Sequence, residues 1–105
     1  MTETRDLGAL TADDFRTCQD SIFELRPIEG TGETWLRLTS VSESALRNAD
    51  PERRKAFTLV FIGSAQIPLP QSMYRISHPD MGAMDIFIVP IAADAETRTY
   101  EAIFN

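Results

Sequence analysis

The chain has 105 residues, of which 43% are hydrophobic and 25% are charged, with 10 Lys and Arg residues against 16 Asp and Glu residues. This length and composition are typical of one globular domain and exclude a multidomain enzyme. The net charge of −6 argues against a nucleic-acid partner, because phosphate binding needs a concentrated basic surface. We expect one domain over residues 1–105, with residues 1–9 as a flexible N-terminal tail.

The cysteine count and the distribution of apolar residues indicate in which cellular compartment the protein is expected. The chain has a single cysteine, Cys18, so it cannot form an intramolecular disulfide. The first ten residues carry charges of both signs without an apolar stretch, and no apolar run approaches the roughly 18 residues that a membrane helix needs. The sequence therefore predicts a soluble, cytoplasmic protein without a membrane segment.

The first expected element is a short helix within Leu10–Asp20. Thr11 is a suitable N-cap, and two acidic residues follow it, where the helix dipole favours negative charge. Phe15 and Cys18 lie three residues apart, so they share one face of a helix of about two turns. We expect this face to pack on a sheet, with Cys18 acting as a small buried hydrophobic residue.

Beyond Asp20 the apolar residues recur with a period of two, which is typical of strands. The pattern predicts six strands, over Ser21–Arg26, Thr34–Ser42, Ala56–Ile62, Gln71–Ser77, Ala83–Val89 and Arg98–Phe104. Glu29–Glu33 is expected to be a hairpin turn, and Glu43–Lys55 an exposed loop.

For three of these strands the sequence predicts which side chains share a face or where the strand ends. In Thr34–Ser42 the alternation places Leu36 and Leu38 on one face, with Trp35 and Val41 on the other. Ala56–Ile62 is rich in β-branched and aromatic residues on both faces and should be central, with Phe61 buried. Pro90 is expected to close the fifth strand, since proline cannot donate to a ladder.

The connections between the expected strands are short, which favours antiparallel pairing. A closed or curled sheet would also protect its edges from other chains. We therefore predict a mainly β fold, either a small antiparallel barrel or a curled six-stranded meander with one short N-terminal helix.

Catalytic chemistry has few candidate residues in this chain. The single histidine, His78, excludes any site built on several imidazoles. A Cys18–His78 pair is the minimal nucleophile and base, but nothing in the sequence spacing brings the two together. We expect no catalytic residues, no metal site and no cofactor, and an enzyme is the less favoured class.

Four residues are candidates for an interaction surface or pocket. Trp35 and Tyr74 are aromatic residues of the kind that contribute much of the binding energy in protein interfaces, although core packing is the default for both. His78 and Asp80 lie in the segment His78–Gly82, whose Pro, Asp and Gly predict a chain reversal.

Several different short motifs are spread along most of the chain. They are Leu10–Phe15, Leu69–Gln71 followed by Tyr74–Ile76 and His78-Pro79, Ile86–Ile91, and Tyr100–Asn105. Over Leu10–Asn105 the sequence resembles a family of small uncharacterised bacterial proteins, a domain of unknown function. The resemblance implies no assigned activity and no catalytic residues, and it implies that members are encoded near phage tail or tail-collar-like proteins.

The sequence favours a non-enzymatic structural or protein-interaction module, with a phage-tail-like assembly as the specific expectation. Its partners would be proteins, including copies of itself, because a last strand at a sheet edge would offer unpaired backbone to another subunit. The alternative is a small ligand-binding domain or enzyme with a pocket at the barrel mouth, lined by Tyr74, His78, Met84 and acidic loop residues. A filled interior would count against this alternative.

Overall fold

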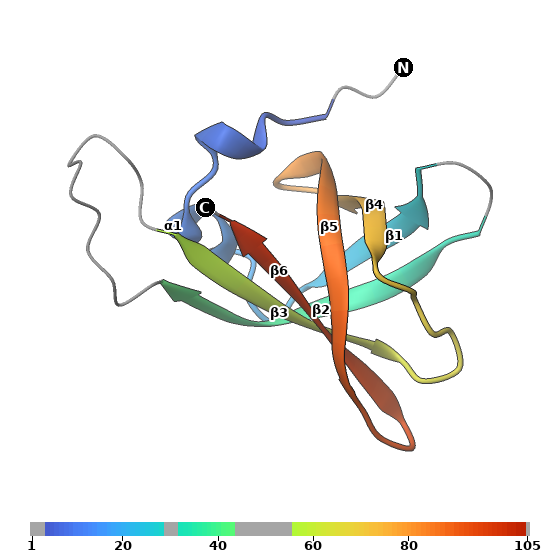
Figure 1. Ribbon diagram of the computed structural model, residues 1–105. Helices are drawn as coiled ribbons and strands as arrows, with labels where there is room; N and C mark the ends of the chain where they lie inside the picture. The colour runs from blue at the N-terminus through green and yellow to red at the C-terminus, as the bar shows by residue number, and fades with distance from the viewer. Residues whose placement is uncertain (1–3, 29–31, 44–55, 105) are drawn as a thin grey trace.

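The computed structural model describes residues 4–28, 32–43 and 56–104. The expected loop Glu43–Lys55 therefore lies outside the described residues except for Glu43, and the expected turn Glu29–Glu33 lies partly outside them. Six strands wind around one core, with a short helix near one end (Figure 1). The strands are β1 (Ile22–Pro27), β2 (Thr34–Glu43), β3 (Phe57–Ser64), β4 (Ser72–His78), β5 (Gly82–Ala93) and β6 (Thr97–Phe104).

The sheet closes into a barrel in the order β1-β2-β3-β6-β5-β4, with every neighbouring pair antiparallel. The prediction of a mainly β fold with a small antiparallel barrel is thus confirmed. The connection from β3 to β4 joins strands that are not neighbours, so the order is not a simple meander. The last strand, β6, pairs with both β3 and β5, so the condition under which it would offer unpaired backbone to another subunit, a position at a sheet edge, is not met.

The inward faces of the strands form the core, as the period-two pattern predicts. Phe61 is fully buried and meets Phe23 edge to face, with ring centroids 5.7 Å apart. Contacts of this geometry add to the gain from burying apolar surface. The inward residues of the strands include Phe23, Leu25, Leu36, Leu38, Phe57, Leu59, Phe61, Ile76, Met84, Ile86, Ile88, Tyr100, Ala102 and Phe104.

The helix α1 (Ala12–Arg16) starts as the sequence predicts, although it is shorter than two turns. Thr11 accepts a hydrogen bond from the Asp14 N–H, and the Asp14 carboxylate accepts one from the Thr11 N–H. This reciprocal pair satisfies two donors that a helix start leaves free. Phe15 packs against both Phe57 and Phe104, with ring centroids 5.8 and 5.4 Å away, and so holds α1 against the barrel.

The segment expected to be a flexible tail contains a turn of 3-10 helix, η1 (Leu7–Ala9), whose Gly8 N–H is capped by the Asp6 carboxylate. Thr4 forms a bridge with Ala83, and the Arg5 N–H donates to the Ala83 carbonyl at 2.8 Å. In residues 4–9 the structure therefore differs from the expected tail. Pairing with the start of β5 supplies the contacts that the composition of this segment does not reveal.

Two local irregularities also depart from the expected pattern. The register of β2 against β3 shifts between Leu38 and Ser40, so Val41 packs against the core on the side of Leu38 instead of opposite it. In addition, β5 continues through Pro90 to Ala93, with a second register shift between Pro90 and Ala92. Proline is compatible with a strand at such a bulge, so the prediction that Pro90 ends the strand is wrong.

A close approach between neighbouring strands requires glycine at position 63. A Cβ atom there would lie 2.9 Å from Leu36 Cδ2 and 3.4 Å from the Trp35 carbonyl oxygen. Because the Trp35 oxygen is backbone and Leu36 is fully buried, neither can move freely. We expect Gly63→Ala to lower the free energy of unfolding by about 1–3 kcal/mol, the usual cost of overpacking. Urea denaturation monitored by Trp35 fluorescence measures it, and an unchanged midpoint would contradict the close contact.

Candidate functional site

A cluster of polar side chains lies where two distant segments meet. His78 is the last residue of β4, while Cys18 and Ser21 belong to the connection between α1 and β1. Because β1 pairs with β4, with Glu24 opposite Ser77, the start of β1 lies beside the end of β4. The Cys18 Sγ atom is 3.7 Å from His78 Nδ1. The spacing in the sequence gives no sign of this contact, because the barrel closure that pairs β1 with β4 brings Cys18 and His78 together.

Hydrogen bonds define the tautomer of His78. Its Nδ1 atom accepts from the Asp80 backbone N–H at 3.0 Å, and its Nε2 atom lies 3.0 Å from Ser21 Oγ. A backbone N–H can only donate, so Nδ1 must carry the lone pair, and the proton of the neutral ring is on Nε2. Nε2–H then donates to Ser21 Oγ, and the Ser21 hydroxyl donates to the Cys18 carbonyl. We call Cys18, Ser21, His78 and Asp80 the His78 cluster.

Burial limits what the His78 cluster can do as a catalyst. Cys18 is 3% exposed, which confirms the prediction that it is a buried residue, and its thiol lies 3.7 Å from Thr17 Oγ1. His78 is 9% exposed, and its ring centroid lies 4.6 Å from that of Phe23. A substrate cannot reach the thiol without an opening of this region. In this conformation the hydrogen bonds of His78 link the α1–β1 connection to the β4–β5 turn.

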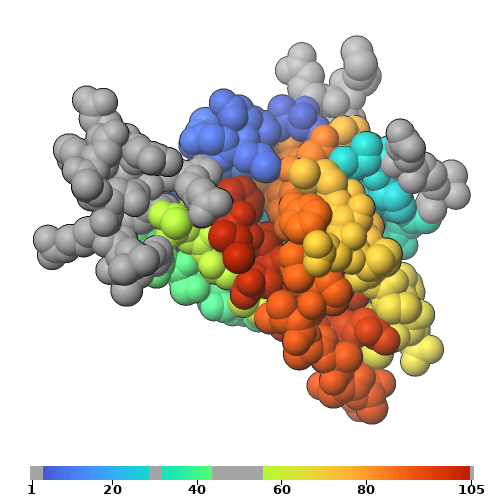
Figure 2. Space-filling model, viewed as in Figure 1, coloured from blue at the N-terminus to red at the C-terminus, as the bar shows by residue number. Residues whose placement is uncertain are grey.

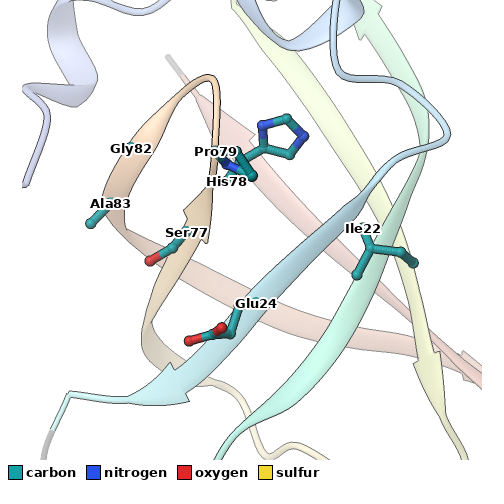
Figure 3. A pocket seen from close by; sticks show the side chains of 7 residues that line it. All are labelled: Ile22, Glu24, Ser77, His78, Pro79, Gly82 and Ala83. Carbon is teal, nitrogen blue, oxygen red and sulfur yellow. The ribbon is translucent and has the colours of Figure 1, made fainter.

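A pocket of about 500 Å³ lies on the outer side of β1 and β4, next to the His78 backbone (Figure 3). Glu24, Ser77 and Ala83 line it, whereas the His78 imidazole points away from the Glu24 and Ser77 side chains. The imidazole and a carboxylate therefore do not converge on this pocket. Met84 and Tyr74, expected at a barrel mouth, are core residues.

The other sequence candidates lie on different surfaces. Tyr74 is buried and donates through its hydroxyl to the Pro70 carbonyl at 2.7 Å, and burial raises the pKa of this phenol. Trp35 is 38% exposed on the outer face of β2, opposite Glu24 of β1. Asp80 is exposed in the turn after β4. The structure thus brings His78 and Asp80 together and leaves Trp35 and Tyr74 elsewhere.

An apolar surface that the sequence analysis did not single out runs across β4, β5 and β6. Met73, Phe87 and Ile103 are exposed by 43%, 46% and 62%, and Met73 lies directly opposite Phe87 in the ladder. The β5–β6 ladder ends at the pair Val89–Glu101. Phe87 lies two residues before Val89 and Ile103 two residues after Glu101, so both point to the outer face of adjacent strands. The three strands form one continuous face in Figure 2, from yellow through orange to red. We call Met73, Phe87 and Ile103 the β4–β6 patch.

Charged residues border the β4–β6 patch. Arg75 and Asp85 are cross-strand neighbours joined by two hydrogen bonds of 2.9 and 3.1 Å. The Arg75 guanidinium holds the pKa of the Asp85 carboxyl below its usual range. An apolar centre with a polar border is the usual composition of a protein interface. Apolar residues at outward positions of three strands are the sequence feature that could have identified it.

Taken together, the fold and the site define a small closed β-barrel protein in which buried Cys18 and His78 meet the partly buried Ser21, with an exposed apolar patch on the outer face. The chain belongs to the family described as a domain of unknown function, DUF6916, whose model matches residues 10–104. The resemblance to a family of unknown function is thus confirmed. No curated protein and no solved structure matches the chain. Within the described residues, no helix is long and apolar enough to cross a membrane.

Proposed function

We propose that the protein is a non-enzymatic module that binds another protein through the β4–β6 patch. The observation that carries the proposal is the alignment of three large, roughly half-exposed apolar side chains on adjacent strands of a closed barrel. Contiguous exposed apolar surface with a polar border marks interaction sites more often than chance exposure. Because each strand pairs on both sides, the partner contacts side chains rather than adding a strand.

For the particular setting, we propose a phage-tail-like assembly in the bacterial cytoplasm. Two considerations support it: the setting near tail-like proteins that the sequence resemblance implies, and a closed barrel whose described residues present an exposed apolar patch. Assemblies of this kind need fixed surfaces that meet the same neighbour in every repeat. The partner is then a tail-like protein or a second copy of this chain.

Affinity purification from the native host tests this proposal. The tagged wild-type chain should recover assembly proteins in fixed ratio, or copies of itself, and a Phe87→Glu, Ile103→Glu variant should lose them. Removing a central apolar contact from an interface typically costs 2 kcal/mol or more, which is about a thirty-fold loss of affinity. Ile67→Glu is the matched control, since Ile67 is similarly exposed but lies in the β3–β4 connection. Equal recovery by wild type and the double variant would contradict the proposal.

A second candidate function is small-ligand binding, and the pocket of about 500 Å³ beside β1 and β4 favours it. Native mass spectrometry of the purified protein distinguishes the two functions. A lone barrel carrying a small molecule in fixed stoichiometry would favour ligand binding over the interaction module.

A further inference from the structure

The His78 cluster contains three side chains of the types that bind transition metals. The Cys18 thiol, the His78 imidazole and the Asp80 carboxylate each offer one ligand atom, and these atoms all lie within 4.8 Å of one another. Cys18 and His78 are 60 positions apart in the sequence. Sulfur, imidazole nitrogen and carboxylate oxygen together are a donor set that zinc accepts.

The distance between the two buried ligand atoms fits a tetrahedral ion. Zinc binds sulfur at about 2.3 Å and imidazole nitrogen at about 2.0 Å, so a tetrahedral angle separates these ligands by about 3.5 Å. The distance from Cys18 Sγ to His78 Nδ1 is 3.7 Å. Asp80 lies two residues beyond His78 in an exposed turn, so a change in its side-chain rotamer can bring its carboxylate to the third position.

The surroundings of His78 already orient the ring for coordination through Nδ1. Metal-binding histidines usually donate their other ring N–H to a fixed acceptor, which sets the tautomer and the plane of the ring. Here Nε2 donates to Ser21 Oγ at 3.0 Å, and the Ser21 hydroxyl is held in turn by the Cys18 carbonyl. Ser21 is therefore a positioning residue for such a site.

Binding requires two local changes. The Cys18 thiol releases its proton to solvent as the sulfur–metal bond forms. The Nδ1 lone pair, which accepts from the Asp80 N–H at 3.0 Å, must turn to the ion, so the exposed turn shifts and that N–H bonds to water. Since Asp80 is exposed while Cys18 and His78 are buried, the ion enters from the side of Asp80.

We propose that Cys18, His78 and Asp80 bind one zinc-class divalent ion, with water in the fourth position. The donor set carries the preference: a thiolate and an imidazole favour zinc or cobalt over magnesium or calcium, which prefer oxygen ligands alone. This site is independent of the proposed interaction surface, because the β4–β6 patch lies on other residues.

Titration of the full chain with Co²⁺ tests the proposal, because the absorption spectrum of bound cobalt depends on the type and number of its ligands. The expected result is a thiolate-to-cobalt charge-transfer band in the near ultraviolet, with visible bands of tetrahedral intensity, both abolished by one equivalent of Zn²⁺. Cys18→Ser should remove the charge-transfer band. A wild-type chain that stays folded, with its thiol reduced, and shows no such band at saturating Co²⁺ would overturn the proposal.

Two milder variants keep the test valid if Cys18→Ser fails to fold. Asp80→Asn preserves the size of the side chain and the backbone N–H that bonds Nδ1, so the fold should stay intact while Co²⁺ affinity falls about tenfold or more. Ser21→Ala keeps all three ligands and should weaken affinity by a similar factor. Glu33→Gln is the control: it removes an exposed carboxylate near the start of β2 and should leave the Co²⁺ affinity unchanged. Equal affinity for Asp80→Asn and wild type would overturn the assignment.

Discussion

Phe61→Ala should lower the free energy of unfolding by about 3–5 kcal/mol, the usual cost of removing a fully buried phenylalanine ring. Phe61 lies in the middle of β3, with no exposed surface, and its ring meets Phe23 edge to face. The variant loses the apolar surface that the ring buries, and a cavity remains in its place. The strands of the closed barrel are paired on both sides, so they cannot move inward to fill it. Equilibrium denaturation in urea, with the slope compared between variants, measures the loss.

Phe87→Ala is the matched control, because the same ring is removed from the outer face of β5, where it is 46% exposed. We expect a loss below about 1 kcal/mol, as for most surface substitutions. Similar losses for the two variants would contradict the assignment of inward and outward faces. A loss below about 1 kcal/mol for Phe61→Ala would be enough, without the control, to contradict the burial of Phe61 in β3.

His78→Ala should lower the free energy of unfolding by about 2–4 kcal/mol, since two hydrogen bonds of about 1 kcal/mol each and the packing of the ring are lost together. The ring joins the Ser21 hydroxyl to the Asp80 N–H and packs against Phe23. Its removal breaks the hydrogen bonds that link the α1–β1 connection to the β4–β5 turn. Thermal or urea unfolding measures the loss, and hydrogen exchange should show the Asp80 and Met81 amides losing protection first.

His78→Asn separates the two hydrogen bonds. The asparagine Oδ1 atom occupies a position near that of Nδ1 and can accept from the Asp80 N–H, while the bond to Ser21 is lost. We expect an intermediate loss of stability. If His78→Asn and His78→Ala unfold alike, the bond to the turn contributes nothing. Where His78→Ala remains folded, partner binding should be largely intact, because the ring is buried and the β4–β6 patch does not include it.

The strands could be predicted from the sequence because each has one face that must be buried. In β1, Phe23 and Leu25 alternate with the charged residues Glu24 and Arg26, and this alternation sets which side chains point inward. The helix start could be predicted because Thr11 and Asp14 interact within one turn. Both features depend on residues close in sequence, where spacing and geometry are directly related.

The local failures have a common origin. Val41 and Pro90 lie next to register shifts, and a shift depends on how a strand matches its neighbour rather than on its own pattern. Likewise, the pairing of Thr4 with Ala83 depends on a strand that comes almost 80 residues later. In each case the deciding contact comes from another strand, so the residues on either side of these positions do not reveal it.

The sequence by itself determined the β class, the short capped helix and the inward faces of the strands. Only the tertiary structure decided the strand order, the closure of the sheet and the contact between Cys18 and His78. Closure pairs β1 with β4, and that pairing brings Ser21 and Cys18 to the end of β4. The patch of Met73, Phe87 and Ile103 instead lies on the successive antiparallel strands β4, β5 and β6. The His78 cluster thus depends on long-range pairing, which no local spacing in the sequence encodes.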